Sequence, residues 1–347
     1  MCALLTGASS GNATILRDDV LACARAERVH LLLGDRLAHP ALTAEVREAA
    51  ALDAARGAEL CRVLDVLATA GVEAILIKGA ALAHTHYPSP ALRPRLDTDL
   101  MIRPDHRAAA EWALGVIGYT RPIETDGDLC TAQFHVARRD AAGIEHALDV
   151  HWRVSNVLAF ADVLTYDDLA SEAVSIDALG PHAFAPSSVH SLVLACIHRV
   201  AHHRESTHLL WLQDIHLLAE SLSRQDQATL HAFAESRRVR AVCAAGLLAA
   251  GQAFVGVAVD LAARIAPPAG TREPTSMFLG QRLRPVDILT TDIQALHRWS
   301  ERLQLVRELL FPPREYMVAR YGMRRPFWLP FLYVRRFVLG TPKWFRS

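Results

Sequence analysis

The chain has 347 residues, of which 51% are apolar, so it can bury a core of two ordinary domains. Its 37 basic and 37 acidic residues give zero formal net charge, which argues against general nucleic-acid binding, because such proteins usually carry a broad basic excess. The charges are unevenly placed: residues 314–347 hold eight basic side chains and one acid, about +7 for this basic aromatic tail.

The cysteines and the apolar runs indicate the cellular compartment of the protein. The six cysteines are scattered without a Cys-x-x-Cys pair, which fits a reducing compartment. We see no basic region followed by an apolar run and a cleavage site, and the apolar stretch 327–345 is interrupted by arginines and prolines. We therefore expect a cytoplasmic protein without a transmembrane segment.

The first predicted elements are helices followed by a short strand. Residues 13–70 are rich in Ala and Leu at helical spacing, which predicts a helical lead-in. Gly71 ends it, and the β-branched run 72–77 predicts a buried strand. Helical character resumes at residues 80–86, so Lys78 and Gly79 lie at a strand-to-helix turn, where backbone N–H groups can hold an anion.

An acidic strand follows the loop 87–94. Alternation along residues 97–103 puts Asp97 and Asp99 on one face and Leu100 and Ile102 on the other. Two neighbouring carboxylates repel each other unless a cation lies between them, and hard oxygen ligands suit Mg²⁺ or Mn²⁺. This stretch predicts a metal site.

A hairpin supplies a third acid. After a helix at 104–117, residues 132–139 and 144–152 predict two antiparallel strands joined by the turn 140–143. In the second strand Leu148 and Val150 share one face, while Asp149 and His151 share the other.

The remaining chain is predicted to be mainly helical. The pattern indicates helices at 187–203, 209–218, 225–256 and 286–310, a loop or linker at 266–285, and then the basic aromatic tail. We predict three regions: the lead-in (1–70), an α+β domain (71–185) and a helical domain with the tail (186–347).

Several motifs together resemble a known family. They are Leu76-Ile-Lys78-Gly79, Arg93-x-x-x-Asp97-x-Asp99-Leu, Gly118-Tyr119 and Leu148-Asp149-x-His151-Trp152, with Tyr87, Trp211-Leu-x-Asp214-Ile and Phe311-Pro-x-x-Glu315-Tyr316. This set resembles a family of uncharacterised bacterial nucleotidyltransferases within the DNA polymerase β-like nucleotidyltransferase superfamily, over most of the chain.

The resemblance implies an α+β fold with a mixed sheet and three carboxylates that hold two Mg²⁺ ions, with Mn²⁺ as an alternative. Asp97 and Asp99 would ligate the metals, and Asp149 would complete the site and act as the base. Gly79 would let the triphosphate of an NTP approach backbone N–H groups. The sequence departs from the wider superfamily at Lys78-Gly79-Ala80, where a Gly-Ser or Gly-Gly pair is usual.

Three other side chains near these motifs each allow two interpretations. Lys78 is one of only two lysines and fits a phosphate-binding turn, or it closes the strand by chance. The planar guanidinium of Arg93 suits the oxygens of a phosphate, or it supports the acids through a structural salt bridge. His151 supports Asp149 from the same strand face, or it packs at a strand end.

The leading hypothesis is a Mg²⁺-dependent nucleotidyltransferase that moves a nucleoside monophosphate from an NTP to an unidentified acceptor. That acceptor is a small molecule, a protein, an RNA end, or a peptide such as one from a biosynthetic cluster. One alternative is a nucleotide- or phosphopeptide-binding accessory protein without turnover. Another is a helical metal-dependent hydrolase built on His198, His202 and Asp214, although packing or a place in the substrate cleft explains these histidines better.

Overall fold

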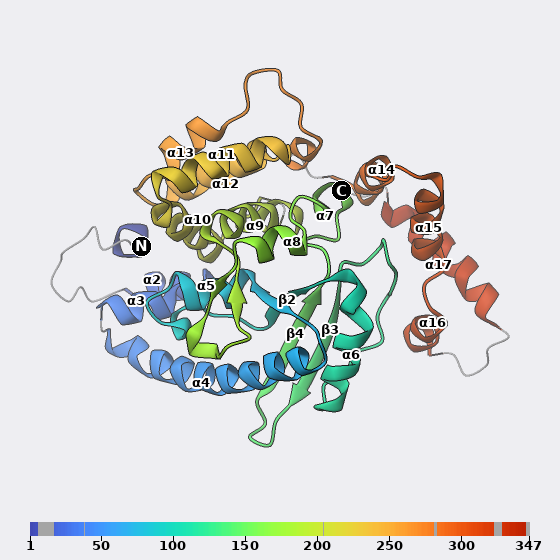
Figure 1. The fold of residues 1–347 in the computed structure, drawn as a ribbon, viewed down its shortest axis with the longest axis horizontal. Coiled ribbons are helices and arrows are strands. Elements are labelled where there is room, and N and C mark those ends of the chain that lie inside the picture. The colour runs from blue at the N-terminus through green and yellow to red at the C-terminus, as the bar shows by residue number, and fades with distance from the viewer. Residues whose placement is uncertain (6–16, 38, 204, 281–282, 323–327, 345–347) are drawn as a thin grey trace.

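The computed structural model of the protein describes residues 1–5, 17–37, 39–203, 205–280, 283–322 and 328–344. At its centre lies a four-stranded mixed sheet with the order β1-β2-β4-β3 (Figure 1). The strands are β1 (Ala74–Ile77), β2 (Thr98–Ile102), β3 (Gln133–Arg139) and β4 (Glu145–His151). Strand β2 pairs antiparallel with β1 and parallel with β4, and β3 and β4 form the expected hairpin. This confirms the α+β class, with a mixed sheet and a helical C-terminal region.

The N-terminal lead-in consists of separate helices, and its residues 13–16 lie outside the described residues. The helices are α1 (Cys2–Leu5), α2 (Asp18–Ala26), α3 (His30–Leu37) and α4 (Pro40–Thr69). Helix α4 has proline in its first turn, where a missing N–H costs nothing. It is followed by Gly71 with a φ of 74°, which turns the chain toward β1.

Short helices connect the strands. They are α5 (Lys78–Thr85), η1 (Pro90–Leu92), η2 (Pro104–His106), α6 (Arg107–Val116), α7 (Leu158–Ala161), α8 (Tyr166–Ser171) and η3 (Asp177–Leu179). A small second sheet pairs β5 (Val174–Ser175) with β6 (Phe184–Ala185), which the sequence did not predict. The strands of this second sheet are two residues long, too short for an alternating pattern to reveal them.

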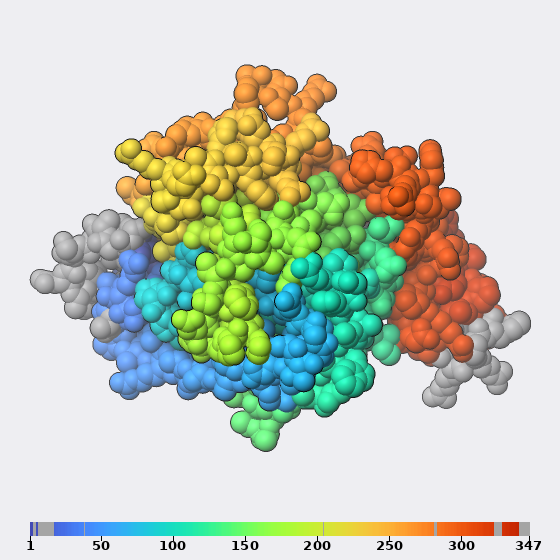
Figure 2. Space-filling view, viewed as in Figure 1, coloured from blue at the N-terminus to red at the C-terminus, as the bar shows by residue number. Residues whose placement is uncertain are grey.

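The C-terminal region is helical, as predicted. Its elements are α9 (Ser188–Ala201), α10 (Leu209–Ser221), α11 (Arg224–Ser236), α12 (Arg240–Ala253), α13 (Ala258–Ile265), η4 (Pro274–Phe278), α14 (Pro285–Ala295), α15 (Trp299–Leu310), α16 (Arg314–Tyr321) and α17 (Leu329–Trp344). The Ser187 hydroxyl accepts the His190 N–H and so caps α9, as expected. Helices α14–α17 form the orange and red mass at one end of the molecule (Figure 2).

Two expectations for this region were wrong. The helix predicted at 286–310 is two helices, because Leu296 is extended and the Arg298 N–H donates to Glu301 to start α15. The predicted loop 266–285 contains η4, whose start at Pro274 follows the preference of proline for a first helical turn.

The sheet separates two hydrophobic cores. On one face Leu100, Ile102, Leu148 and Val150 pack with residues of α4 and α6. On the other face Ile75, Ile77 and Met101 join a core that extends through α9–α13. Asp99 and Asp149 point to this second face, so the C-terminal helices come to lie over the acids. Among the described residues, none of the helices has both the length and the apolar character needed to cross a bilayer.

Candidate active site

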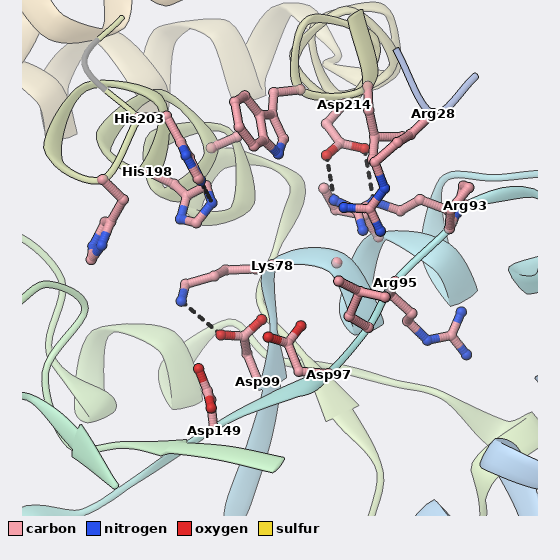
Figure 3. Close-up of a pocket in the computed structure, with 18 of the residues that line it drawn as sticks. Arg28, Lys78, Arg93, Arg95, Asp97, Asp99, Asp149, His198, His203 and Asp214 are labelled. Atoms are coloured by element: carbon pink, nitrogen blue, oxygen red, sulfur yellow. Dashed lines mark hydrogen bonds and ion pairs between the residues drawn. The ribbon is translucent and has the colours of Figure 1, made fainter. Parts of the chain in front are cut away.

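A cavity of about 430 Å³ lies between the acids of the sheet and the helices α9 and α10 (Figure 3). Lys78, Gly79, Arg93, Asp97, Asp99 and Asp149 all line it. His151 lies at the end of β4, is 1% exposed, and contacts two of the lining residues, Asp99 and Lys78. The structure therefore brings the residues predicted from the sequence to one place.

Strand register sets Asp99 and Asp149 side by side. Asp99 of β2 lies opposite Asp149 of β4 in the parallel pairing and opposite Ile77 of β1 in the antiparallel one. Residues opposite each other in a sheet point to the same face. Asp97, just before β2, also lines the cavity, and burial, with the charges of Asp99 and Asp149, raises its pKa above the ordinary value.

Asp99 is bound by two side chains. Its Oδ1 accepts hydrogen bonds from Lys78 Nζ at 2.7 Å and from His151 Nε2 at 2.9 Å, and these two nitrogens are 3.2 Å apart. Burial raises the pKa of Asp99, but the Lys78 charge and the His151 hydrogen bond outweigh it and hold the pKa well below the usual range. His151 therefore supports Asp99, whereas the sequence had suggested Asp149.

Asp149 has partners that the sequence reasoning missed. His135 Nδ1 donates to its Oδ1 at 2.6 Å, and Gln133 Nε2 donates to its Oδ2 at 2.7 Å. Both residues belong to β3, where His135 lies opposite Asp149. The predicted turn at 140–143 would pair Arg139 with Ile144 and so set His135 opposite Leu148. In the structure the Asp140 N–H donates to Ile144 O and Arg139 pairs with Glu145, and this shift of one residue sets His135 opposite Asp149.

The carboxylates and the imidazole fit a divalent cation. Ligand atoms of Asp99, Asp149 and His151 all lie within 4.8 Å of one another, which among the described residues is the one such group of three or more. Asp97 is outside this group, although it lines the same cavity. The ammonium of Lys78 lies 2.7 Å from Asp99 Oδ1 and 3.2 Å from His151 Nε2, so it neutralises part of the negative charge of this group.

Lys78 begins α5 with an unusual backbone. Its φ is 52°, a left-handed conformation that is uncommon for residues other than glycine. Ile77 before it is extended, so the chain turns sharply from β1 into α5. This turn directs the Lys78 side chain to Asp99, although the sequence had suggested a phosphate.

Arg93 is engaged in a buried ion pair. Its Nε and Nη2 donate to Asp214 at 3.0 and 2.6 Å, the arginine is 7% exposed, and the Tyr87 hydroxyl donates to the same carboxylate at 2.8 Å. The salt-bridge reading of Arg93 is thus correct, but the acid it holds is Asp214 of α10. Arg93 Nη1 remains beside Gly79, where an added Cβ would lie 2.2 Å from it.

Histidines form the wall opposite the acids. His198, His202 and His203 line the cavity, and the His203 ring stacks on Trp211 with centroids 3.7 Å apart. Burial lowers the pKa of all three histidines, that of His202 to about 4, so they are neutral at pH 7. His198, His202 and Asp214, the residues of the hydrolase alternative, all line the cavity, but among the described residues they do not form a group that could hold a metal ion. Asp214 is instead held by Arg93 and Tyr87.

A comparison with protein families identifies a relationship over most of the chain. A family model described as "Uncharacterised nucleotidyltransferase" matches residues 15–255. The matched segment contains the central sheet, every residue predicted for the site and the helices α9–α12 that cover it. No curated protein matches the chain.

Proposed function

We propose, from the premise that the chain belongs to the family of uncharacterised nucleotidyltransferases, that this enzyme takes a nucleoside monophosphate from an NTP with the help of Mg²⁺. The acceptor oxygen attacks the α-phosphorus, the bond from that phosphorus to the bridging oxygen breaks, and pyrophosphate leaves. The observation that carries the proposal is the pairing of Asp99 with Asp149 across parallel strands, with Asp97 in the same cavity.

Asp97, Asp99 and Asp149 would hold the cations, and His151 would orient Asp99. When bound, Mg²⁺ neutralises charge on the phosphates and makes the acceptor hydroxyl more acidic. Mn²⁺ is an alternative, because carboxylate oxygens suit it as they suit Mg²⁺. Asp149 is proposed to accept the hydroxyl proton, and His135 and Gln133 keep its carboxylate in position.

The pairing of charges at the cavity supports a substrate that is bound together with a cation. Three of the basic side chains each hold a carboxylate: Lys78 with Asp99, Arg93 with Asp214, and Arg95 with Asp53. Asp97 and Asp149 have no Lys or Arg partner among the described residues, so negative charge remains for a cation. An NTP with its divalent ion matches this arrangement.

Transfer of label from each radiolabelled NTP, with Mg²⁺ and a panel of acceptors, tests the proposal. We expect transfer by the wild type and by Asp105→Ala, which removes an exposed acid on η2 that does not line the cavity. We expect Asp97→Ala and Asp99→Ala to lose at least about 100-fold in rate, as with the removal of other groups that stabilise the transition state. Transfer that survives the loss of both acids would refute the mechanism, and NTP binding without transfer to any acceptor would favour the accessory-protein alternative.

A further inference from the structure

Arg28 is a cavity residue that no motif indicated. It lies in the short turn between α2 and α3, in the N-terminal lead-in, and it lines the cavity at the same end as Arg93 (Figure 3). The other lining residues named so far come from the sheet region and from α9 and α10. Arg28 thus brings a positive charge into the site from the N-terminal lead-in, in which the sequence had indicated no site residue.

The Arg28 guanidinium lacks the partner that its neighbours have. Within the described residues its side chain forms no hydrogen bond or ion pair, whereas Arg93 holds Asp214 and Arg95 holds Asp53. Burial, and next the positive charge of Arg93, lower the pKa of Arg28. The charges of Asp97 and Asp214 act in the opposite direction. Because Asp214 is already held by Arg93, an anion in the cavity would compensate the charge of the partly desolvated Arg28.

The backbone of Arg28 adds to this cost. Its φ is 56°, and at the C-terminal end of a helix this left-handed position is usually glycine. The turn is held because the Arg28 N–H donates to Arg25 O at 3.0 Å and the Val29 N–H donates to Ala24 O at 2.9 Å. The 1% exposed Val29 anchors it in the core. A non-glycine residue held in such a conformation at a cavity indicates a role for its side chain.

Arg93 and Gly79 complete the same end of the cavity. Arg93 uses Nε and Nη2 for Asp214, and its Nη1 lies against Gly79, where a Cβ would displace it. A donor of Arg93, the guanidinium of Arg28 and the backbone at Gly79 therefore face one volume. Planar guanidinium groups are well matched to phosphate oxygens.

We propose that Arg28 binds the polyphosphate of the NTP, so that the N-terminal helices complete the donor subsite. This inference rests on the proposed function. It assigns the end of the cavity at Arg28, Arg93 and Gly79 to the leaving pyrophosphate, and the opposite end, near Asp149 and the histidines, to the acceptor.

Binding of inorganic tripolyphosphate, of NTP and of the matching nucleoside, measured by titration calorimetry at fixed Mg²⁺, tests this assignment. Arg28→Gly removes the guanidinium and also relieves the backbone conformation, so this variant is expected to fold at least as well as the wild type. Arg47→Ala, at an exposed position of α4, is the control for loss of one positive charge.

We expect Arg28→Gly to weaken tripolyphosphate and NTP binding by about 10-fold or more, as for a charge-assisted hydrogen bond. Nucleoside binding should be unchanged, Arg28→Lys should restore part of the loss, and Arg47→Ala should match the wild type. Equal tripolyphosphate affinity in Arg28→Gly and wild type, or an equal loss for the nucleoside, would overturn the role of Arg28. Failure of the wild type itself to bind NTP or tripolyphosphate would instead overturn the proposed function.

Discussion

Replacing Gly79 with alanine tests whether the Arg93–Asp214 ion pair depends on the missing side chain at this position. The new Cβ would lie 2.2 Å from Arg93 Nη1 and 3.0 Å from Cζ. Ordinary contact begins near 3.4 Å, so Nη1 would have to move by about 1.2 Å. Arg93 is 7% exposed and is held by two hydrogen bonds, of 3.0 and 2.6 Å, so Nη1 can move only toward the cavity and at the expense of these bonds.

The expected cost follows from these contacts. Overpacking a buried site costs about 1–3 kcal/mol, and expelling the guanidinium from Asp214 would cost about 3–5 kcal/mol. The better helix propensity of alanine offsets up to about 1 kcal/mol of this cost. If Arg93 keeps its bonds to Asp214, Gly79→Ala should lower the free energy of unfolding by up to about 3 kcal/mol, and expulsion of the guanidinium would add to this loss. Tripolyphosphate binding should also weaken. Urea denaturation and calorimetry measure the two effects.

A matched control separates packing from propensity. Gly115 lies in α6 with nothing within 4 Å of an added Cβ and with a negative φ. Gly115→Ala should raise the free energy of unfolding by about 0.5–1 kcal/mol, because it gains only the propensity of alanine. If Gly79→Ala were as stable as Gly115→Ala, with unchanged tripolyphosphate affinity, the packing reasoning would be refuted.

Three further outcomes are expected. Asp214→Ala should lower the free energy of unfolding by about 3–5 kcal/mol in urea, because it leaves the Arg93 charge buried without its partner; a loss under 1 kcal/mol would contradict this. Lys78→Met should tighten Mn²⁺ binding in electron paramagnetic resonance titrations, because the ammonium competes for Asp99; weaker binding would show that Lys78 supports the cation site. Burial raises the pKa of Asp292 to about 6, so the folded carboxyl holds its proton more tightly than the unfolded one, and stability falls as the pH rises from about 4 to 6. Asp292→Asn keeps an acceptor for the Leu158 N–H. Between pH 4.5 and 7.5 the free energy of unfolding, measured in urea, should fall by roughly 1–2 kcal/mol less in this variant than in the wild type, after allowance for solvent screening. Parallel pH profiles of the two proteins would exclude this role.

The acidic faces of the strands were predictable from local pattern. Alternation assigned Leu100 and Ile102 to the core and Asp99 to the opposite face, and the structure confirms this. The existence of the hairpin was predictable for the same reason, but its register was not, because the predicted turn at 140–143 pairs Arg139 with Ile144 and the structure pairs Arg139 with Glu145. A pattern of this kind is carried by residues a few positions apart, so the sequence contains it directly.

The partners of the charged side chains were not predictable in this way. Arg93 binds Asp214, which is 121 residues later in the chain, although Asp97 and Asp99 are much closer in sequence. The break between α14 and α15 was missed because apolar spacing runs through it, while the extended backbone at Leu296 ends the first helix.

By itself, the sequence determined which side chains share a strand face, where the chain turns into α5, and that three acids and Lys78-Gly79 belong to one nucleotidyltransferase-like set. Only the tertiary structure decided that β2 pairs parallel with β4, which sets Asp99 beside Asp149, and that Arg28 of the lead-in enters the cavity. The physical reason is that side-chain periodicity is a local property of the backbone. The pairing of distant strands and charges depends on which arrangement of the whole chain buries its apolar faces and compensates its buried charges.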